Sequence, residues 1–230
     1  MKQIPILSLR FPEIKASANP AVTTKLLGNA KALASDNRAL FAKNGIDPDI
    51  FHNDNIEYSG IQLGNYQGMQ EWTAIGKKHT KALKLWYRIF KKQNANILQN
   101  TVIITETYKP GFLDFSERYK IPVILINDDL AKELNHISDK FARYDRLEKY
   151  LFGNIQRFFN HIGFVHDKSQ NFLKINITRA NLHSKSKQVY HQHKKTAFEI
   201  IFDCNFYLPQ TLRLGQSTAL GYGRTYHLTN

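Results

Sequence analysis

Residues 57–92 read EYSGIQLGNYQGMQEWTAIGKKHTKALKLWYRIFKK. Glu57–Leu63 and Met69–Ile75 are predicted to be short strands, and Asn65–Gly68 is predicted to be the turn between them. From about Lys77 to Lys92, apolar residues recur at helical spacing and lysines fill other positions, which predicts an amphipathic helix. A hairpin of two strands followed by a helix is the middle of a ferredoxin-like unit.

The flanking segments supply the rest of that unit. Upstream, Ile4–Phe11 alternates apolar and polar residues as a half-buried strand does, and Pro12 is expected to end it. Asn19 and Pro20 then predict the start of a helix that continues to about Lys43. Downstream, Ile97–Thr107 is rich in β-branched residues and is predicted to be a strand or hairpin. The order strand, helix, strand, strand, helix, strand predicts a ferredoxin-like domain over residues 1–115.

The second half of the chain is also predicted to be mixed α and β. Predicted strands alternate with two predicted helices, one capped by Asn127 and one from about Asp145 to Gly163. Phe112–Lys120 is expected to be irregular, and Val189–Lys195 to be the tip of a basic hairpin. The predicted strands are Ile121–Ile126, Phe172–Thr178 and Thr196–Leu208. The fold class is therefore α+β, with a second ferredoxin-like domain over residues 116–230.

Charge points to the kind of partner. The 230 residues contain 32 Lys and Arg against 19 Asp and Glu, a formal net charge of +13. Such a surplus attracts polyanions, and nucleic acid is the leading partner. A membrane is discounted, because no apolar run could span a bilayer and no helix has a wholly basic polar face. The absence of a signal-peptide pattern favours the cytoplasm. The single cysteine, Cys204, excludes an internal disulfide and is expected in the core, and neither a metal nor a cofactor is predicted.

A glycine-rich stretch near the C-terminus is the first candidate binding site. Residues 214–227 read LGQSTALGYGRTYH. Glycine permits positive φ angles and close backbone approach, so this stretch is expected to offer bare N–H groups, hydroxyls and a guanidinium to a phosphate. The alternative is a plain turn between strands Leu208–Leu214 and Leu220–Leu228. The residues predicted to bind RNA here are Gly215, Gln216, Gly221, Tyr222, Gly223 and Arg224.

Other candidate residues lie outside that stretch. His52 stands among polar residues, and an imidazole suits proton transfer at neutral pH, with Asp54 able to orient it and Tyr58 able to donate a proton. The alternative for His52 is an ordinary surface histidine. Lysines in three segments are predicted to contact phosphates, although a solvated lysine face is the alternative: Lys77 and Lys78, Lys185 and Lys187 in a Ser/Lys-rich stretch expected to be a mobile loop, and Lys194 and Lys195.

Several of these motifs resemble the CRISPR-associated repeat-processing endoribonucleases of the RAMP superfamily. The glycine loop of that family has an apolar residue and Gly, five residues, then Gly-apolar-Gly, as in Leu214-Gly215 and Gly221-Tyr222-Gly223. Ile50-Phe-His-Asn-Asp54 is similar to a Leu-Phe-His-Asn-His segment of one branch. The strand and Leu-Pro before the loop, the central helix and a Tyr-x-x-Ile-Gln strand also resemble that branch, in Phe198–Pro209, Leu147–Gly163 and Tyr58–Leu63.

The resemblance implies two ferredoxin-like domains and metal-independent cleavage within CRISPR repeats. It implies attack of a 2′-hydroxyl on the adjacent phosphate, with His52 as general base or acid. It also implies repeat RNA as partner, and it leaves room for CRISPR effector subunits and a homodimer. Two residues depart from the family pattern, since Asp54 replaces a histidine and Gln216 replaces a frequent lysine. A protein that binds the repeat or the guide RNA without cutting it is therefore an alternative, as is an RNA-binding module outside CRISPR biology.

Overall fold

The computed structural model describes residues 3–16, 20–51, 58–95, 98–165, 172–183, 187–190 and 193–228, and of residues 20–24, 187–190 and 193 the backbone alone. The chain forms two compact units, one comprising Gln3–Tyr108 and the other beginning at Lys109. Residues 109–115, which the sequence analysis assigned to the first domain, therefore pack within the second unit.

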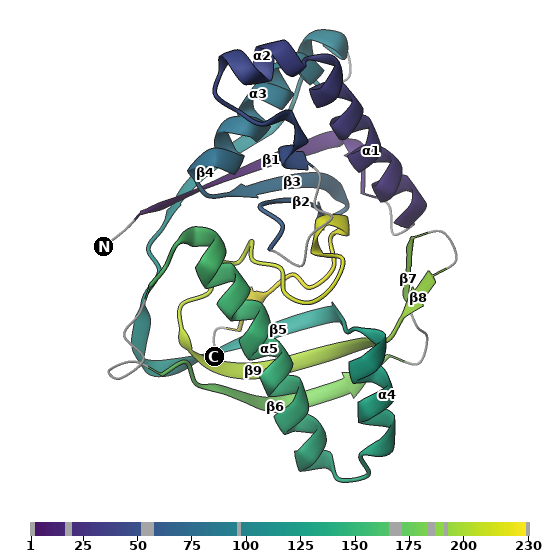
Figure 1. Ribbon diagram of the computed structural model, residues 1–230, viewed down its shortest axis with the longest axis vertical. Helices are drawn as coiled ribbons and strands as arrows, with labels where there is room; N and C mark the ends of the chain where they lie inside the picture. Colours follow the sequence, from purple (N-terminus) through teal and green to yellow (C-terminus); the bar gives the residue numbers. More distant parts are fainter. Residues whose placement is uncertain are drawn as a thin grey trace. The chain divides into compact units, whose positions relative to one another are not determined.

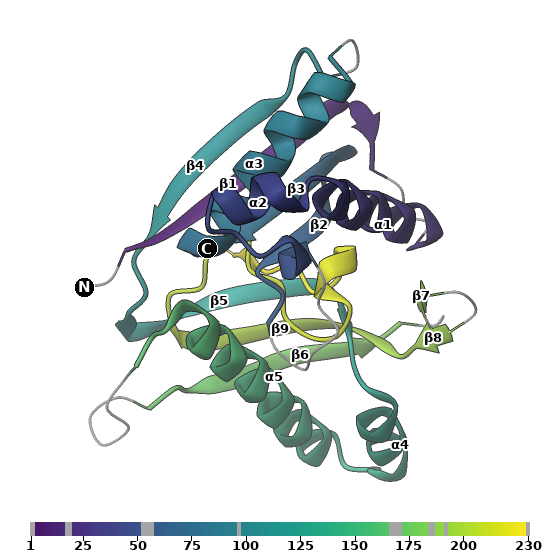
Figure 2. The same cartoon turned by 45° about the horizontal axis from the view of Figure 1, so that its top comes forward.

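The first unit has the predicted βαββαβ order, and Figures 1 and 2 show α1 and α3 on one face of its sheet. Its four strands are antiparallel in the order β2-β3-β1-β4, which is the ferredoxin-like arrangement. In chain order, the elements are β1 (Ile4–Lys15), α1 (Pro20–Asp36), α2 (Arg38–Lys43), a 3₁₀ turn (Pro48–Phe51), β2 (Ile61–Tyr66), β3 (Met69–Ile75), α3 (Lys77–Gln93) and β4 (Val102–Tyr108).

The core of the first unit explains why these segments form. Alternate residues of the strands, including Leu9 and Trp72, are buried against residues at helical spacing on α3, such as Leu83 and Trp86. The indoles of Trp72 and Trp86 stack with their centroids 4.6 Å apart. The helical and strand periodicities therefore meet in one apolar layer.

The ends of one strand and one helix in the first unit differ from the sequence prediction. Pro12 does not end β1, because the strand continues to Lys15 through an irregularity in its register with β3; proline is tolerated at such a bulge. The helix predicted to reach Lys43 divides at Asn37, whose side-chain amide donates to Leu33 O at 2.8 Å. A side chain that bonds to the local backbone competes with continuation of a helix.

The second unit has the same strand arrangement, with a difference near its end. The sheet order is β10-β5-β9-β6, all antiparallel, and a separate hairpin pairs β7 with β8. Between β9 and β10, where the second helix of a ferredoxin-like unit belongs, the chain has residues 207–225 with one short 3₁₀ turn. The elements are β5 (Phe112–Leu125), α4 (Asp128–His136), α5 (Lys140–Ile162), β6 (Ile175–Leu182), β7 (Lys187–Tyr190), β8 (His193–Lys195), β9 (Ala197–Phe206), the 3₁₀ turn (Thr218–Leu220) and β10 (Tyr226–His227).

The prediction that Phe112–Lys120 is irregular is wrong, because these residues belong to β5. This strand changes register with β9 between Phe112 and Glu117 and again between Ile121 and Ile124. Pro122 lies in the second irregularity, where a missing N–H is tolerated. These bulges interrupt the alternation of apolar residues that identifies a strand from sequence.

The helix ends and the cysteine of the second unit agree with the sequence. Asn127 caps α4 by accepting from Leu130 N, and Gly163 ends α5 with a left-handed conformation. Cys204 is buried in β9, and burial raises the pKa of its thiol to about 12. In the part of the chain that the structure describes, no helix combines the length and apolar character needed to cross a membrane.

Candidate nucleic-acid interface

The glycine loop, residues 214–224, is held tightly by its own unit. Gly215 N donates to Asn154 Oδ1 of α5 at 3.1 Å, and Gln216 N donates to Leu125 O of β5 at 3.0 Å. Gly223 N donates to Val123 O at 2.9 Å. The loop is thus fixed to the end of β5 and to the middle of α5.

The prediction of bare N–H groups at the loop's glycines is therefore wrong. In addition to Gly215 and Gly223, Gly221 donates to Thr218 O at 3.0 Å, within the 3₁₀ turn. The same holds for the N–H of Gln216, which has an acceptor in β5. A backbone donor that is already paired is not available to a phosphate, so these four N–H groups do not supply contacts to RNA.

Close approach within the protein explains two of the glycines. Gly215 has φ +95°, and a Cβ there would lie 2.6 Å from Ile124 Cγ1 and 2.8 Å from Leu125 O. Gly223 has φ +80°, and a Cβ there would lie 1.7 Å from Leu214 O. The glycine spacing thus lets the loop fold onto β5 and onto itself.

A tyrosine on α5 supports the same attachment point. Tyr150 donates its hydroxyl hydrogen to Leu125 O at 2.9 Å, the carbonyl that also accepts from Gln216 N. Burial raises the pKa of Tyr150 to about 12, so the hydroxyl stays a donor throughout the physiological range. The side chain of Asn154 is held in place on α5, since its Nδ2 donates to the backbone carbonyl of Tyr150 at 2.8 Å.

The side chains of the glycine loop and of its flanking residues differ in how exposed they are, and therefore in whether they can contact RNA. Gln216 is half-buried, and Arg224 is half-buried with its guanidinium carbon 5.5 Å from the ring centroid of Tyr226. Tyr222 packs beside Leu125 and Ala197, so its ring belongs in part to the core. Arg213 has no exposed surface, which removes it as a substitute for the lysine that the family pattern has at Gln216.

The basic hairpin of β7 and β8 belongs to the same unit. Lys194 is exposed, whereas Lys195 Nζ lies 2.8 Å from Asp128 Oδ2 at the start of α4. Lys187 pairs with Lys195 in the backbone register of the hairpin. Lys185 lies outside the described residues. Four lysines of this unit are predicted to bind RNA, and the side chains of two, Lys194 and Lys195, are described. Of these two, Lys194 is exposed and forms no ion pair with a described residue.

Residues 179–187 are the Ser/Lys-rich stretch predicted to be a mobile loop, and their described part begins in β6 and ends at the start of β7. Arg179 lies in β6, opposite Ile201 of β9. His183 is tied to β5, because its Nε2 lies 2.8 Å from Pro122 O. The pattern of small polar and basic residues that suggested a loop is also compatible with an edge strand, since Lys and other charged residues are common at sheet edges.

The predicted catalytic residues belong to the first unit. His52 and Asp54 lie outside the described residues, and Tyr58 is half-buried. The structure adds His79, at the start of α3, because a Cβ on Gly60 would lie 2.4 Å from its ring atoms Cδ2 and Nε2. His79 thus packs against the segment that follows Tyr58.

Helix α3 presents the strongest charged face of the first unit. Its 17 residues include no Asp or Glu, and seven exposed cations lie along it. Lys77 and Lys78 stand in the first turn, where cations oppose the helix dipole, so folding does not favour them there. A bound anion would compensate that cost. The seven residues are Lys77, Lys78, Lys81, Lys84, Arg88, Lys91 and Lys92.

Comparison with known proteins places this architecture in a class. The chain is similar to the solved structure "Crystal structure of Cas6b", with a TM-score of 0.68 and 20% sequence identity. It is also similar to "Crystal structure of CRISPR RNA processing endoribonuclease Cas6b", with a TM-score of 0.66 and 18% identity. Each comparison covers 99% of this chain and 100% of the other. A third, Csf5, a CRISPR-Cas type IV Cas6 crRNA endonuclease, gives 0.57 and 13% over 99% of this chain and 100% of that one. A search of curated protein sequences found no match. The tandem ferredoxin-like fold is thus that of Cas6 proteins.

The second unit shows which protein family the chain belongs to. Residues 113–228 match the model of the Cas6b C-terminal domain, which is half of the chain, and the chain belongs to this family. The match includes β5, α5, β9 and the glycine loop. The resemblance to CRISPR repeat-processing proteins is thereby confirmed.

Proposed function

We propose that the protein is a metal-independent endoribonuclease that cleaves within CRISPR repeats of precursor RNA and releases guide RNAs. The observation that carries the proposal is the family match over residues 113–228. The Phe51-His52-Asn53 motif of the other unit supports it, because a histidine there can transfer protons. The exposed cations of α3 and the net charge of +13 supply the attraction to RNA.

The reaction needs three groups. A base takes the proton of the 2′-hydroxyl, whose oxygen attacks the adjacent phosphorus; the bond from phosphorus to the 5′-oxygen breaks as an acid protonates that oxygen. The products are a 2′,3′-cyclic phosphate and a 5′-hydroxyl. His52 takes one proton-transfer role, and Tyr58, a lysine or His79 takes the other, because Asp54 is ionised at neutral pH unless its environment prevents it. A lysine stabilises the charge on the phosphorane.

The proposed partners follow from the same chemistry. Repeat RNA is the substrate, and the guide RNA is the product handed to CRISPR effector subunits in the cytoplasm, with the protein acting alone or as a homodimer. A second candidate function rests on two residues, Asp54 and Gln216, which replace a proton donor and a cation of the family pattern. In that case the protein holds the repeat or the guide without cutting it.

Cleavage in the presence of EDTA tests the proposal. The protein is incubated with its cognate repeat RNA in excess EDTA, and the product ends are analysed. We expect cleavage at one position, with a cyclic phosphate on the upstream fragment and a 5′-hydroxyl that kinase labels without prior phosphatase treatment. Complete dependence on added Mg²⁺ would contradict the mechanism. Tight binding of the repeat without cleavage would favour the second function.

Removing charge at the start of α3 tests the role of that helix. In Lys77→Gln/Lys78→Gln, we expect weaker RNA binding and a log–log salt slope reduced by about 1.4, at roughly 0.7 per phosphate contact on a single strand. The fold is expected to be retained, since neutral residues suit a helix N-terminus better than cations do. Affinity is measured by filter binding at several salt concentrations.

The matched control removes two charges elsewhere. Lys132 and Lys149 are exposed on α4 and α5, and Lys149 pairs with Asp145. Lys132→Gln/Lys149→Gln has the same net charge as the α3 variant. Equal salt slopes for the two double variants would show that only net charge matters and would remove α3 from the interface.

A further inference from the structure

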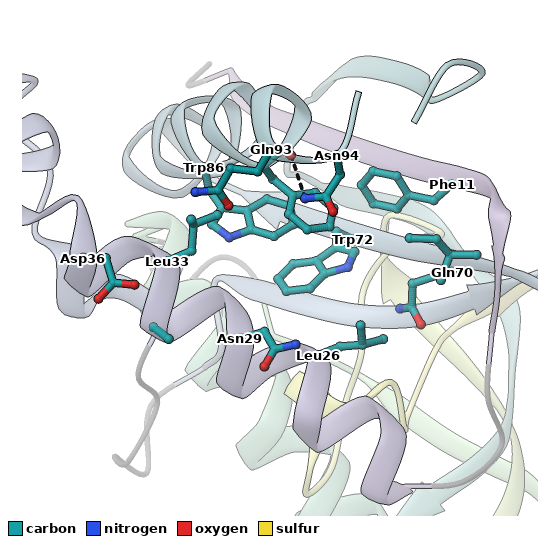
Figure 3. A pocket seen from close by; sticks show the side chains of 13 residues that line it. Phe11, Leu26, Asn29, Leu33, Asp36, Gln70, Trp72, Trp86, Gln93 and Asn94 are labelled. Atoms are coloured by element: carbon teal, nitrogen blue, oxygen red, sulfur yellow. Dashed lines mark hydrogen bonds between the residues drawn. The ribbon is translucent and has the colours of Figure 1, made fainter. Parts of the chain in front are cut away.

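A pocket of about 500 Å³ lies within the first unit, between α1 and α3 and above β1 and β3 (Figure 3). Leu26 and Leu33 of α1 line one side, while Trp86 and Phe90 of α3 line the other. Small-molecule sites are commonly hollows of about 300–1,000 Å³ with mostly apolar walls and a few polar groups. The volume is thus suitable for a group the size of a nucleoside.

The pocket wall is a stack of aromatic rings. Trp72 and Trp86 stack at 4.6 Å with an interplanar angle of 18°, and Trp86 and Phe90 stack at 4.7 Å with the same angle. Trp86 is therefore the middle ring and Trp72 is one end of the stack. Figure 3 shows Leu26 and Asn29 of α1 on the side of Trp72 away from Trp86. Trp72 is 3% exposed, so a planar ring that extends the stack by one member has to displace the α1 side chains that cover Trp72.

The polar groups at the pocket suit a neutral ligand that both donates and accepts hydrogen bonds. Asn29 of α1 and Gln93 of α3 line it with carboxamides that make no side-chain hydrogen bond to a described residue. The Nε1 atom of Trp86 is buried and has no acceptor among the described residues, which is a costly state for a donor. The described lining includes one carboxylate, Asp36, and no Lys or Arg, so a phosphate would not be favoured.

We propose that this pocket binds a nucleobase. The base stacks on Trp72, and the carboxamides of Asn29 and Gln93 pair with its ring nitrogens and exocyclic groups, as Asn and Gln pair with bases elsewhere. The ribose and any phosphate stay outside the pocket, because its described lining has no Lys or Arg. The base comes either from a free nucleoside or from an unpaired position of bound RNA. The second source rests on the proposed function, and the first does not.

Tryptophan fluorescence reports on this pocket alone. The chain contains two tryptophans, and both line the pocket. Adenosine, guanosine, cytidine and uridine are titrated to millimolar concentration, and a short single-stranded RNA is titrated separately. We expect saturable quenching by at least one nucleoside, with or without quenching by the RNA. Quenching by nucleosides alone identifies a free nucleoside as the source, and competition between nucleoside and RNA identifies the RNA.

Two substitutions on α1 test whether the quenching arises in the pocket. Ala32 is exposed at the rim and lines the pocket, whereas the exposed Ser35 does not. Ala32→Phe is expected to weaken binding roughly tenfold or more, since stacking of one base is lost, and Ser35→Phe is expected to leave it unchanged. Equal melting temperatures and emission maxima of the two variants show that both fold.

Three results would overturn the proposal. They are no quenching by any nucleoside or by RNA, linear quenching that never saturates, and equal affinity in Ala32→Phe and Ser35→Phe. None of these requires cleavage activity. A protein that binds nucleosides but does not cut the repeat would refute the proposed function and keep this site, and a nuclease whose tryptophans are quenched neither by nucleosides nor by RNA would do the reverse.

Discussion

His52→Ala is expected to lower the rate of repeat cleavage by about 10²–10⁴-fold while leaving RNA affinity within a factor of about three. The rate loss follows from removing a positioned proton-transfer group, whose usual contribution has that size. Affinity is expected to persist because phosphate contacts from cations dominate binding to RNA, and one neutral imidazole adds little to them. Single-turnover cleavage with enzyme in excess measures the chemical step, and filter binding measures the affinity.

The control for His52→Ala is a second histidine in an exposed position. His136 is exposed in the last turn of α4, in the other unit, so His136→Ala removes an imidazole without touching the motif. Its cleavage rate is expected to equal that of the parent protein. If His52→Ala cleaves at the parental rate, His52 has no role in the mechanism. If both variants lose activity together, the loss reflects something other than the Phe-His-Asn motif.

The second proton-transfer group can be found in the same assay. Tyr58→Phe removes a hydroxyl and keeps the ring, and His79→Asn removes the imidazole that lies against Gly60. Whichever residue is the partner of His52, its loss in the His52→Ala background is expected to cost little more, because groups that act as a unit are not additive. A residue with only a structural role would instead add its effect to that of His52→Ala.

The sequence predicted the elements whose signals are local. The apolar spacing of α3, the Asn127 cap of α4 and the left-handed Gly163 at the end of α5 each depend on a few neighbouring residues. It also predicted the fold class, because the order of strands and helices in the first half leaves few arrangements. The buried position of Cys204 followed from its apolar surroundings.

What the sequence did not reveal depends on contacts between distant residues. Pro12 and Pro122 are usual markers of strand ends, but each lies at a bulge whose partner strand is about 60 or more residues away in the chain. The N–H groups of Gly215 and Gly223 donate hydrogen bonds to Asn154 Oδ1 and Val123 O. The pocket at Trp72 arises because α1 and α3 leave space over the same part of the sheet. No periodicity encodes these pairings.

Gly223→Ala is expected to lower the free energy of unfolding of the second unit by about 3 kcal/mol or more. A φ angle of +80° alone costs a side-chain-bearing residue roughly 1–3 kcal/mol. The added Cβ would also stand 1.7 Å from Leu214 O, an atom of the backbone that cannot rotate away. Leu214 N donates to Gly223 O and Gly223 N donates to Val123 O, so relief of the clash requires breaking hydrogen bonds on both sides of the loop.

Gly153→Ala is the matched control in the same unit. Gly153 lies in α5, and apart from its chain neighbours and the adjacent helix backbone, no atom of the described residues lies within 4 Å of a Cβ built there. The same chemical change should therefore stabilise this unit by about 0.5–1 kcal/mol, since alanine favours a helix interior more than glycine does. The two substitutions are thus predicted to shift stability in opposite directions, and a general intolerance of alanine cannot explain that pattern.

The thiol of Cys204 gives a measurement specific to the second unit. It is fully buried in β9 and its pKa is raised to about 12 by that burial, so it reacts with a disulfide reagent only after the unit opens. In a urea series, we expect thiol labelling of Gly223→Ala at markedly lower urea than in the parent protein, and of Gly153→Ala at slightly higher urea. If Gly223→Ala is labelled at the same urea concentration as the parent, the loop tolerates a side chain at this position. The glycines would then serve something other than the loop's close attachment to β5, and a role in contacting RNA directly would become the better explanation of their spacing.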